Sequence, residues 1–136
     1  MIREGSDLTL WAVGAEVKTA LETADLLHGR DDISCRVVNV RFLKPLDADL
    51  LRKDAQKMPL VTFENTLSGT GLDILADRLL ISEKHCGVLH FAWPSEETIP
   101  HGSNTELRVR FGLTAEAAAQ TIRARFFEKN QEQVPK

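Results

Sequence analysis

The 136-residue sequence lacks several features that would each indicate a class of function. With only two cysteines, Cys35 and Cys86, neither a disulfide framework nor paired C-x-x-C zinc ligands are expected. No apolar run approaches the roughly 20 residues of a membrane span, and no signal-peptide apolar region follows Met1. The net charge of −3 gives no electrostatic case for nucleic acid or an anionic membrane. We therefore expect a cytoplasmic protein that binds neither. Both thiols are expected to be buried and reduced, with a disulfide or a reactive thiol as the alternative.

Motifs of a self-contained catalytic site are also missing. No Gly-x-Ser-x-Gly elbow or Gly-Lys-Ser/Thr phosphate loop occurs, and Ile74 stands where a dinucleotide fingerprint needs its third glycine. The histidines His28, His85 and His90 have no zinc-site spacing. A response-regulator receiver would need an acidic pair after the first strand, where residues 13–15 read Val-Gly-Ala. No strand end gathers an acid, a base and a nucleophile, so we assign no catalytic residue and no metal ligand.

The sequence does contain enough apolar residues to form one hydrophobic core. It is 43% hydrophobic and 27% charged, and its length fits a single domain. We expect that domain over residues 1–128, followed by a polar tail at 129–136.

The apolar spacing predicts strands alternating with helices, as in βαβ units. Strands are expected at 8–13, 35–40, 60–63 and 88–93. Helices are expected to begin at residue 15 and stop at Gly29, to begin at 48, to span 72–80, to begin at 104 and break at Gly112, and to run from 115 through Phe126. Right-handed crossovers then favour the strand order 2-1-3-4 in a parallel sheet. That order creates a crevice at the carboxyl ends of strands one and three, lined by residues 14–16 and 64–71.

Local signals mark several helix ends. Asp47 is a predicted N-cap, with Leu46 stapling onto Leu51 after Pro45 fixes the chain entry. Ser103 and Glu106 form a predicted capping box, and Thr114 caps the last helix. Pro94 ends the fourth strand.

The best candidate for ligand binding is the turn Ser68, Gly69, Thr70 and Gly71. Small residues before a helix leave amides free for an anion, although tight packing of the strand against the helix explains the same residues. Glu64 ends a strand, where a helix cap or surface group is the alternative to a catalytic acid. Arg41 and Lys44 could clamp a phosphate, contact a neighbouring domain or form a solvated turn.

Two further sets of residues have competing interpretations. His101 is a catalytic candidate, but a turn before a capped helix explains the residues around it. The large aromatic side chains are candidate interface anchors, while core packing is the alternative for the tryptophans; they are Trp11, Trp93, Phe111, Phe126 and Phe127.

Ordered blocks across residues 3–127 resemble the C-terminal domain of the transketolase superfamily. The blocks are Leu10-Trp11-Ala12-Val13-Gly14, Arg41-Phe42-Leu43-Lys44-Pro45-Leu46-Asp47, Val61-Thr62-Phe63-Glu64-Asn65, the Gly69/Gly71 helix start, Trp93-Pro94 through Ile99-Pro100-His101-Gly102-Ser103, and Phe111-Gly112-Leu113-Thr114-Ala115-Glu116. Within the superfamily the sequence is most similar to 1-deoxy-D-xylulose-5-phosphate synthases. The resemblance implies an α/β/α sandwich whose mostly parallel five-stranded sheet includes one antiparallel edge strand from Ile2 to Glu4.

The resemblance also implies that the chemistry belongs to other domains. Such a parent enzyme condenses pyruvate with glyceraldehyde 3-phosphate, using thiamine diphosphate and magnesium, for isoprenoid precursors and the thiamine pathway. The Gly-Asp-Gly motif and activating glutamate of that family lie in preceding domains, so this chain is expected to bind no cofactor and to be inactive alone. Its implied role is structural support and homodimer contact beside the catalytic domains.

Departures from the family pattern keep alternatives open. The stretch after Glu64-Asn65 is short, and the turn reads Gly69-Thr70-Gly71 instead of Gly-Gly-x-Gly. A split transketolase or the beta subunit of a 2-oxo-acid dehydrogenase is the alternative parent. A free-standing anion-binding or regulatory module is the alternative of a different class.

Overall fold

The computed structural model describes residues 2–41, 46–93 and 104–127. Its strands are β1 (Leu8–Val13), β2 (Cys35–Val40), β3 (Leu60–Leu67) and β4 (Val88–Trp93). Its helices are α1 (Glu16–Asp31), α2 (Ala48–Lys57), α3 (Leu72–Leu80), α4 (Asn104–Arg110) and α5 (Ala115–Ile122), and a π-helical turn (Arg123–Phe127) continues α5. Strands and helices alternate through β4, as the apolar spacing predicts.

The four strands form one parallel sheet in the order β2-β1-β3-β4, which confirms the predicted topology. Before β1 the chain makes a single antiparallel bridge, in which the amide of Val37 donates to the carbonyl of Arg3 at 2.9 Å. The expected antiparallel pairing is therefore present, but it is one bridge beside four strands and not a fifth strand. The reason is that the chain bends at residues 6–7 into β1, which leaves no length for a longer ladder.

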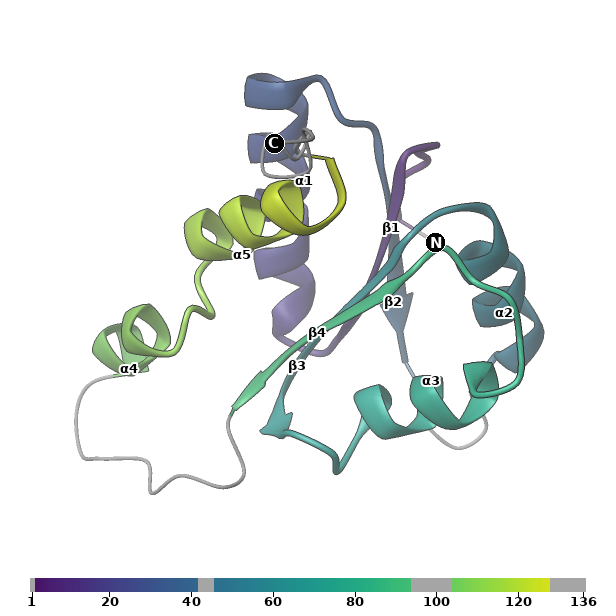
Figure 1. The fold of residues 1–136 in the computed structure, drawn as a ribbon. Helices are drawn as coiled ribbons and strands as arrows, with labels where there is room; N and C mark the ends of the chain where they lie inside the picture. The colour runs from purple at the N-terminus through teal and green to yellow at the C-terminus, as the bar shows by residue number, and fades with distance from the viewer. Residues whose placement is uncertain (1, 42–45, 94–103, 128–136) are drawn as a thin grey trace, which may run out of the picture.

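Helices cover both faces of the sheet, so the molecule has the expected three layers. Figure 1 shows α1 and α5 on one face and α2 and α3 on the other, while α4 projects beyond the end of β4. Buried apolar residues divide accordingly into two clusters. The α1/α5 cluster contains Leu8, Leu10, Leu27, Val37, Phe63 and Ile122, and the α2/α3 cluster contains Trp11, Val38, Leu51, Leu60, Leu72 and Leu80.

Most of the local helix signals act as predicted. The amide of Leu50 donates to Asp47 Oδ1 at 3.2 Å, and the amide of Ala117 donates to Thr114 Oγ1 at 3.2 Å, so both caps are confirmed. Leu46 packs into the same cluster as Leu51, as the staple requires. The break after α4 is confirmed too, since Gly112 adopts a positive φ of 71°. Ser103, Pro45, Pro94 and the tail lie outside the described residues.

Two predicted boundaries are wrong. Gly29 does not stop α1, which continues to Asp31 and closes at Asp32 in the left-handed region (φ 55°). Aspartate tolerates this conformation better than most residues, and its amide donates to the His28 carbonyl at 3.1 Å. β3 extends four residues past its predicted end at Phe63, because Leu67 pairs with Trp93 after an irregularity in the ladder.

The tryptophans belong to the core. Trp11 is 1% exposed and Trp93 is 9% exposed, which confirms the packing interpretation for both. Phe111, Phe126 and Phe127 are half-buried and pack against the α1/α5 cluster. Among the described residues, no helix combines the length and apolarity needed to cross a lipid bilayer.

Candidate functional site

Glu64, on β3, is buried and caps the following helix. Its Oε1 accepts hydrogen bonds from the amide of Leu72 and the hydroxyl of Thr66, and its Oε2 accepts one from the amide of Asp73, all at 2.8 Å. These amides begin α3 and have no carbonyl partner inside the helix. A carboxylate there also complements the positive end of the helix dipole. The interpretation of Glu64 as a cap is confirmed, with the cap supplied from the preceding strand.

Asp73, in the first turn of α3, binds the other side of the same turn. Its Oδ2 accepts from the amide of Gly69 at 2.7 Å, and its Oδ1 accepts from the amides of Ile74 at 2.7 Å and Gly71 at 3.4 Å. A Cβ on Gly71 would lie 2.1 Å from Glu64 Oε1, so only glycine lets the carboxylate approach. The turn is therefore packed tightly around two protein carboxylates.

This arrangement bears directly on the candidate anion site at Ser68, Gly69, Thr70 and Gly71. The amide of Ser68 donates to the Trp93 carbonyl at 2.7 Å, and the glycine amides donate to Asp73. An external anion would be repelled by the two buried carboxylates and would have to displace them from these amides. Anion binding at this turn stays a prediction, and the geometry favours the packing alternative.

The other wall of the predicted crevice is closed by an ion pair. Glu16, 7% exposed at the start of α1, accepts a bidentate pair of bonds from Arg108 of α4 at 2.9 and 3.0 Å. Arg108 also donates to the Leu113 carbonyl at 2.6 Å and to Thr19 Oγ1 at 3.2 Å. The fork holds α4 and its connection to α5 against α1. Sequence reasoning missed Arg108, because its partner lies 92 residues away.

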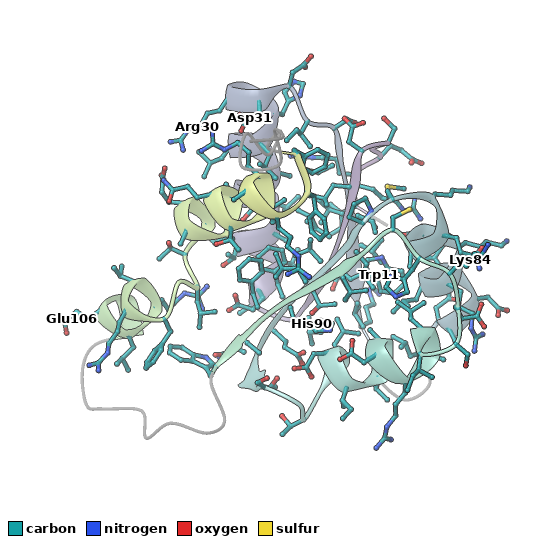
Figure 2. The ribbon with its side chains drawn as sticks, viewed as in Figure 1. Trp11, Arg30, Asp31, Lys84, His90 and Glu106 are labelled. Carbon is teal, nitrogen blue, oxygen red and sulfur yellow. The ribbon has the colours of Figure 1, made fainter. Side chains whose placement is uncertain are left out.

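A second buried carboxylate network lies between the sheet and α2. Asp54 of α2 is 4% exposed, and its Oδ2 accepts from Thr9 Oγ1 at 2.9 Å, Trp11 Nε1 at 3.0 Å and Arg36 Nε at 2.9 Å. Figure 2 shows Trp11 on this side of the sheet. One acceptor therefore satisfies donors from β1 and β2 and joins both strands to α2. No motif indicated it; the only signal is threonine at an inward strand position and aspartate on the apolar face of a helix.

A third polar chain links β3, β4 and α3. Thr62 Oγ1 lies 2.6 Å from His90 Nδ1, and His90 Nε2 lies 2.8 Å from Asp77 Oδ1. Figure 2 places His90 between the sheet and α3. The order of hydroxyl, imidazole and carboxylate is that of a nucleophile with its base. Thr62 is fully buried, however, so no substrate reaches its hydroxyl, and the chain serves to connect the edge strand to α3.

The remaining candidates are dispersed. Arg41 is exposed, while Lys44 and His101 lie outside the described residues. Cys35 is buried, and burial raises the pKa of its thiol to about 12, which keeps it protonated and inert. The expectation that Cys86 is buried is wrong: it lies exposed in the α3–β4 loop, where Sγ is 3.3 Å from the Gln56 carbonyl. Among the described residues no cluster of three or more histidine, cysteine or acidic side chains could hold a metal ion.

Comparisons with known proteins agree on one family. The family model described as "Transketolase, C-terminal domain" matches residues 1–118. A 1-deoxy-D-xylulose-5-phosphate synthase of Heliobacterium modesticaldum is 40% identical over 125 residues, covering 90% of this chain and 19% of the relative. A synthase of the same name from Pelotomaculum thermopropionicum is 32% identical, covering 95% of this chain and 20% of the relative. The chain thus spans about a fifth of the curated relatives that it matches.

Solved structures give the same fold. The structure described as "Split gene transketolase, inactive beta4 tetramer" superposes with a TM-score of 0.80 and 28% identity, covering 90% of this chain and 40% of that one. A transketolase from Campylobacter jejuni superposes with a TM-score of 0.61 over 89% of this chain and 17% of its own, at 18% identity, a likeness of fold alone.

Proposed function

Because this chain belongs to the family of transketolase C-terminal domains, we propose that it is the structural and dimerisation domain of a thiamine-diphosphate-dependent transferase of the 1-deoxy-D-xylulose-5-phosphate synthase type. The observation that carries this proposal is that the chain aligns along most of its length with about a fifth of each such synthase. The rest of the relatives has no counterpart in this chain. The reaction of the parent, in which pyruvate condenses with glyceraldehyde 3-phosphate, is accordingly proposed for the remainder of the enzyme.

The acidic side chains at the described ends of β1 and β3 do not fit the cofactor. Thiamine diphosphate, when bound, supplies a carbanion-stabilising centre, and its diphosphate is normally held through magnesium by free carboxylates and amides. Here Glu64 and Asp73 are hydrogen-bonded to the amides of the turn before α3, and Glu16 is paired with Arg108. The cofactor and every catalytic step are therefore proposed for the preceding domains.

The proposed partners are those catalytic domains and a second copy of the enzyme. Buried polar contacts tie β1 and β2 to α2, β3 to α3, and α4 to α1, which makes the domain a rigid body to which other domains can attach. The cytoplasm is the proposed location. The domain is proposed to end at residue 128, before the 129–136 tail.

A chimera tests the proposal. This chain would replace the C-terminal fifth of the Heliobacterium synthase, and the chimera would be assayed with pyruvate, glyceraldehyde 3-phosphate, thiamine diphosphate and magnesium. We expect synthase turnover and a dimer by light scattering from the chimera, and no turnover from the 136-residue chain alone. A truncated synthase without the C-terminal fifth is the matched control. Turnover by the isolated chain, or a chimera no more active than the truncated control, would contradict the proposal.

A split transketolase is the second candidate parent. The superposition on the split-gene transketolase subunit favours it, since that chain also carries this domain within a longer subunit. A matching graft onto that subunit distinguishes the candidates, because the grafted subunit should form its tetramer only if this domain matches the contacts there. Equal rescue of both parents would mean that the domain is interchangeable and does not determine the substrate.

A further inference from the structure

A groove of about 330 Å³ lies at the opposite end of the sheet from the turn that precedes α3. It is bounded by the segment before β1, by β2 and by one side of α2. Its lining includes Glu4, Arg36, Leu50, Lys53, Lys57 and Met58. The volume is at the lower end of the range found for small-molecule sites.

The N-terminal wall of the groove is held in place by β2 and the residue before it. A Cβ on Gly5 would lie 2.1 Å from the carbonyl carbon of Cys35, so the segment lies flush against the strand. The Ser6 amide donates to Ser34 Oγ at 3.3 Å, and the Ser34 amide donates to Asp7 Oδ2 at 2.8 Å. The groove is therefore a built feature and not a gap beside a loose chain end.

Basic side chains predominate around the groove. Three of its lining residues are basic and two are acidic. One of the acids, Asp54, is buried and already accepts hydrogen bonds from Thr9, Trp11 and Arg36. Lys53 and Lys57 are exposed one turn apart on α2, and within the described residues neither has an ion-pair partner.

The second acid, Glu4, stands where an incoming anion would meet Arg36. Its Oε1 lies 3.3 Å from Arg36 Nη1, and the Glu4 side chain is 77% exposed. The pair is long and its carboxylate stays in solvent, so it contributes little stability. A stronger anion that also contacts the lysines can therefore displace Glu4 without unfolding the wall.

We propose that this groove binds a small molecule bearing a phosphate. The phosphate is held by the Lys53 and Lys57 ammonium groups and replaces Glu4 beside Arg36, while an attached organic part lies over Leu50 and Met58. Lysines bind phosphate as separate point charges, and its several oxygens can accept from donors on different elements. The proposal does not depend on the identity of the parent enzyme.

Chemical-shift mapping of the ¹⁵N-labelled 136-residue chain tests the site. Inorganic phosphate and glycerol 3-phosphate are titrated separately, one arm without and one with an organic part. We expect saturable shifts confined to the amides of residues 4–6, 36 and 50–58, with tighter binding of glycerol 3-phosphate. Shifts that never saturate, or that are equal around every exposed lysine, would overturn the site. Equal affinities in the two arms would overturn the apolar contact.

Variants separate the site from general charge effects. The double variant Lys53→Ala/Lys57→Ala should weaken phosphate binding at least about tenfold, corresponding to roughly 1.4 kcal/mol. Lys18→Ala, at an exposed lysine of α1, is the matched control and should bind as wild type. Glu4→Gln should bind more tightly, because it removes the competing carboxylate. Wild-type affinity in the double variant with an unchanged melting temperature would refute the site, and no gain in Glu4→Gln would refute displacement of Glu4.

Discussion

The two faces of the sheet are built in different ways. Toward α1 and α5, the buried strand side chains that the structure describes form one hydrophobic cluster, which includes Leu10, Val37, Phe63 and Phe91. Toward α2 and α3, every strand contributes a polar side chain that meets a specific partner. These side chains are Arg36 of β2, Thr9 of β1, Thr62 and Glu64 of β3, and His90 of β4.

The difference teaches which face specifies the geometry. Apolar burial is non-directional, so a well-filled core tolerates conservative exchange of its members. A buried carboxylate must keep its donors within hydrogen-bond distance, and removing one partner leaves others unsatisfied. We infer that the α1/α5 face contributes mainly burial, whereas the α2/α3 face also determines where its helices sit.

The largest effect is expected at Asp54. Replacing it by alanine removes the buried acceptor that Arg36, Trp11 and Thr9 share and should lower the free energy of unfolding by about 3–5 kcal/mol. Asp54→Asn keeps the shape and loses the charge, so it should fall between alanine and wild type. Urea unfolding followed by circular dichroism measures all three. A loss below about 1 kcal/mol for Asp54→Ala, the level of an exposed pair, would show that the network is not structurally important.

On the apolar face, Leu27 is the matched position because its side chain is also fully buried. Leu27→Ala should lower the free energy of unfolding by about 3 kcal/mol through lost burial and a cavity. Leu27→Met, which conserves volume, should lower it by less than about 1.5 kcal/mol. If the methionine variant were as damaging as Asp54→Asn by the same urea measurement, the contrast between the faces would fail.

A smaller effect is expected at the cap of α3. Glu64→Ala removes the acceptor of the Leu72 and Asp73 amides and should lower the free energy of unfolding by about 1–2 kcal/mol. Hydrogen exchange at those two amides should accelerate more than exchange in α1. Uniform acceleration across both helices would mean that Glu64 acts on global stability and not as a local cap.

The smallest effect concerns an exposed pair outside both faces. Arg30, labelled at the end of α1 in Figure 2, donates a hydrogen bond to Glu116 on α5. That hydrogen bond and the positive charge of Arg30 lower the pKa of Glu116. The stabilisation is therefore present at neutral pH and is lost as the pH falls through the depressed pKa. Glu116→Gln should shift the urea midpoint slightly at neutral pH, and not in acid or in concentrated salt. A difference from wild type that persists in acid would exclude the ion pair as its cause.

Sequence reasoning worked where the determining interactions are local. Asp47 and Thr114 cap helices by bonding to amides three residues away, so their spacing is visible in the chain. The strand order follows from the handedness of short crossovers. Gly29 was misjudged as a helix stop because a glycine inside a helix weakens it without ending it, and packing of α1 on the sheet outweighs that loss.

The partners of the buried charges could not be predicted in this way. Glu64 was recognisable as a strand-end carboxylate, but its partners, the amides of Leu72 and Asp73, were not. They lie beside it only because the chain turns back from β3 into α3. The exposed position of Cys86 was likewise invisible, since apolar neighbours in sequence do not ensure apolar neighbours in space.

The sequence alone determined the α/β class, the parallel strand order, the helix caps at Asp47 and Thr114, and the resemblance to one domain family. Each depends on short-range periodicity or local hydrogen bonding. Only the tertiary structure decided that Asp54 accepts a hydrogen bond from Thr9, 45 residues away, and that Glu16 accepts one from Arg108, 92 residues away. A buried carboxylate is stable only beside donors, and the chain must fold before those donors reach it.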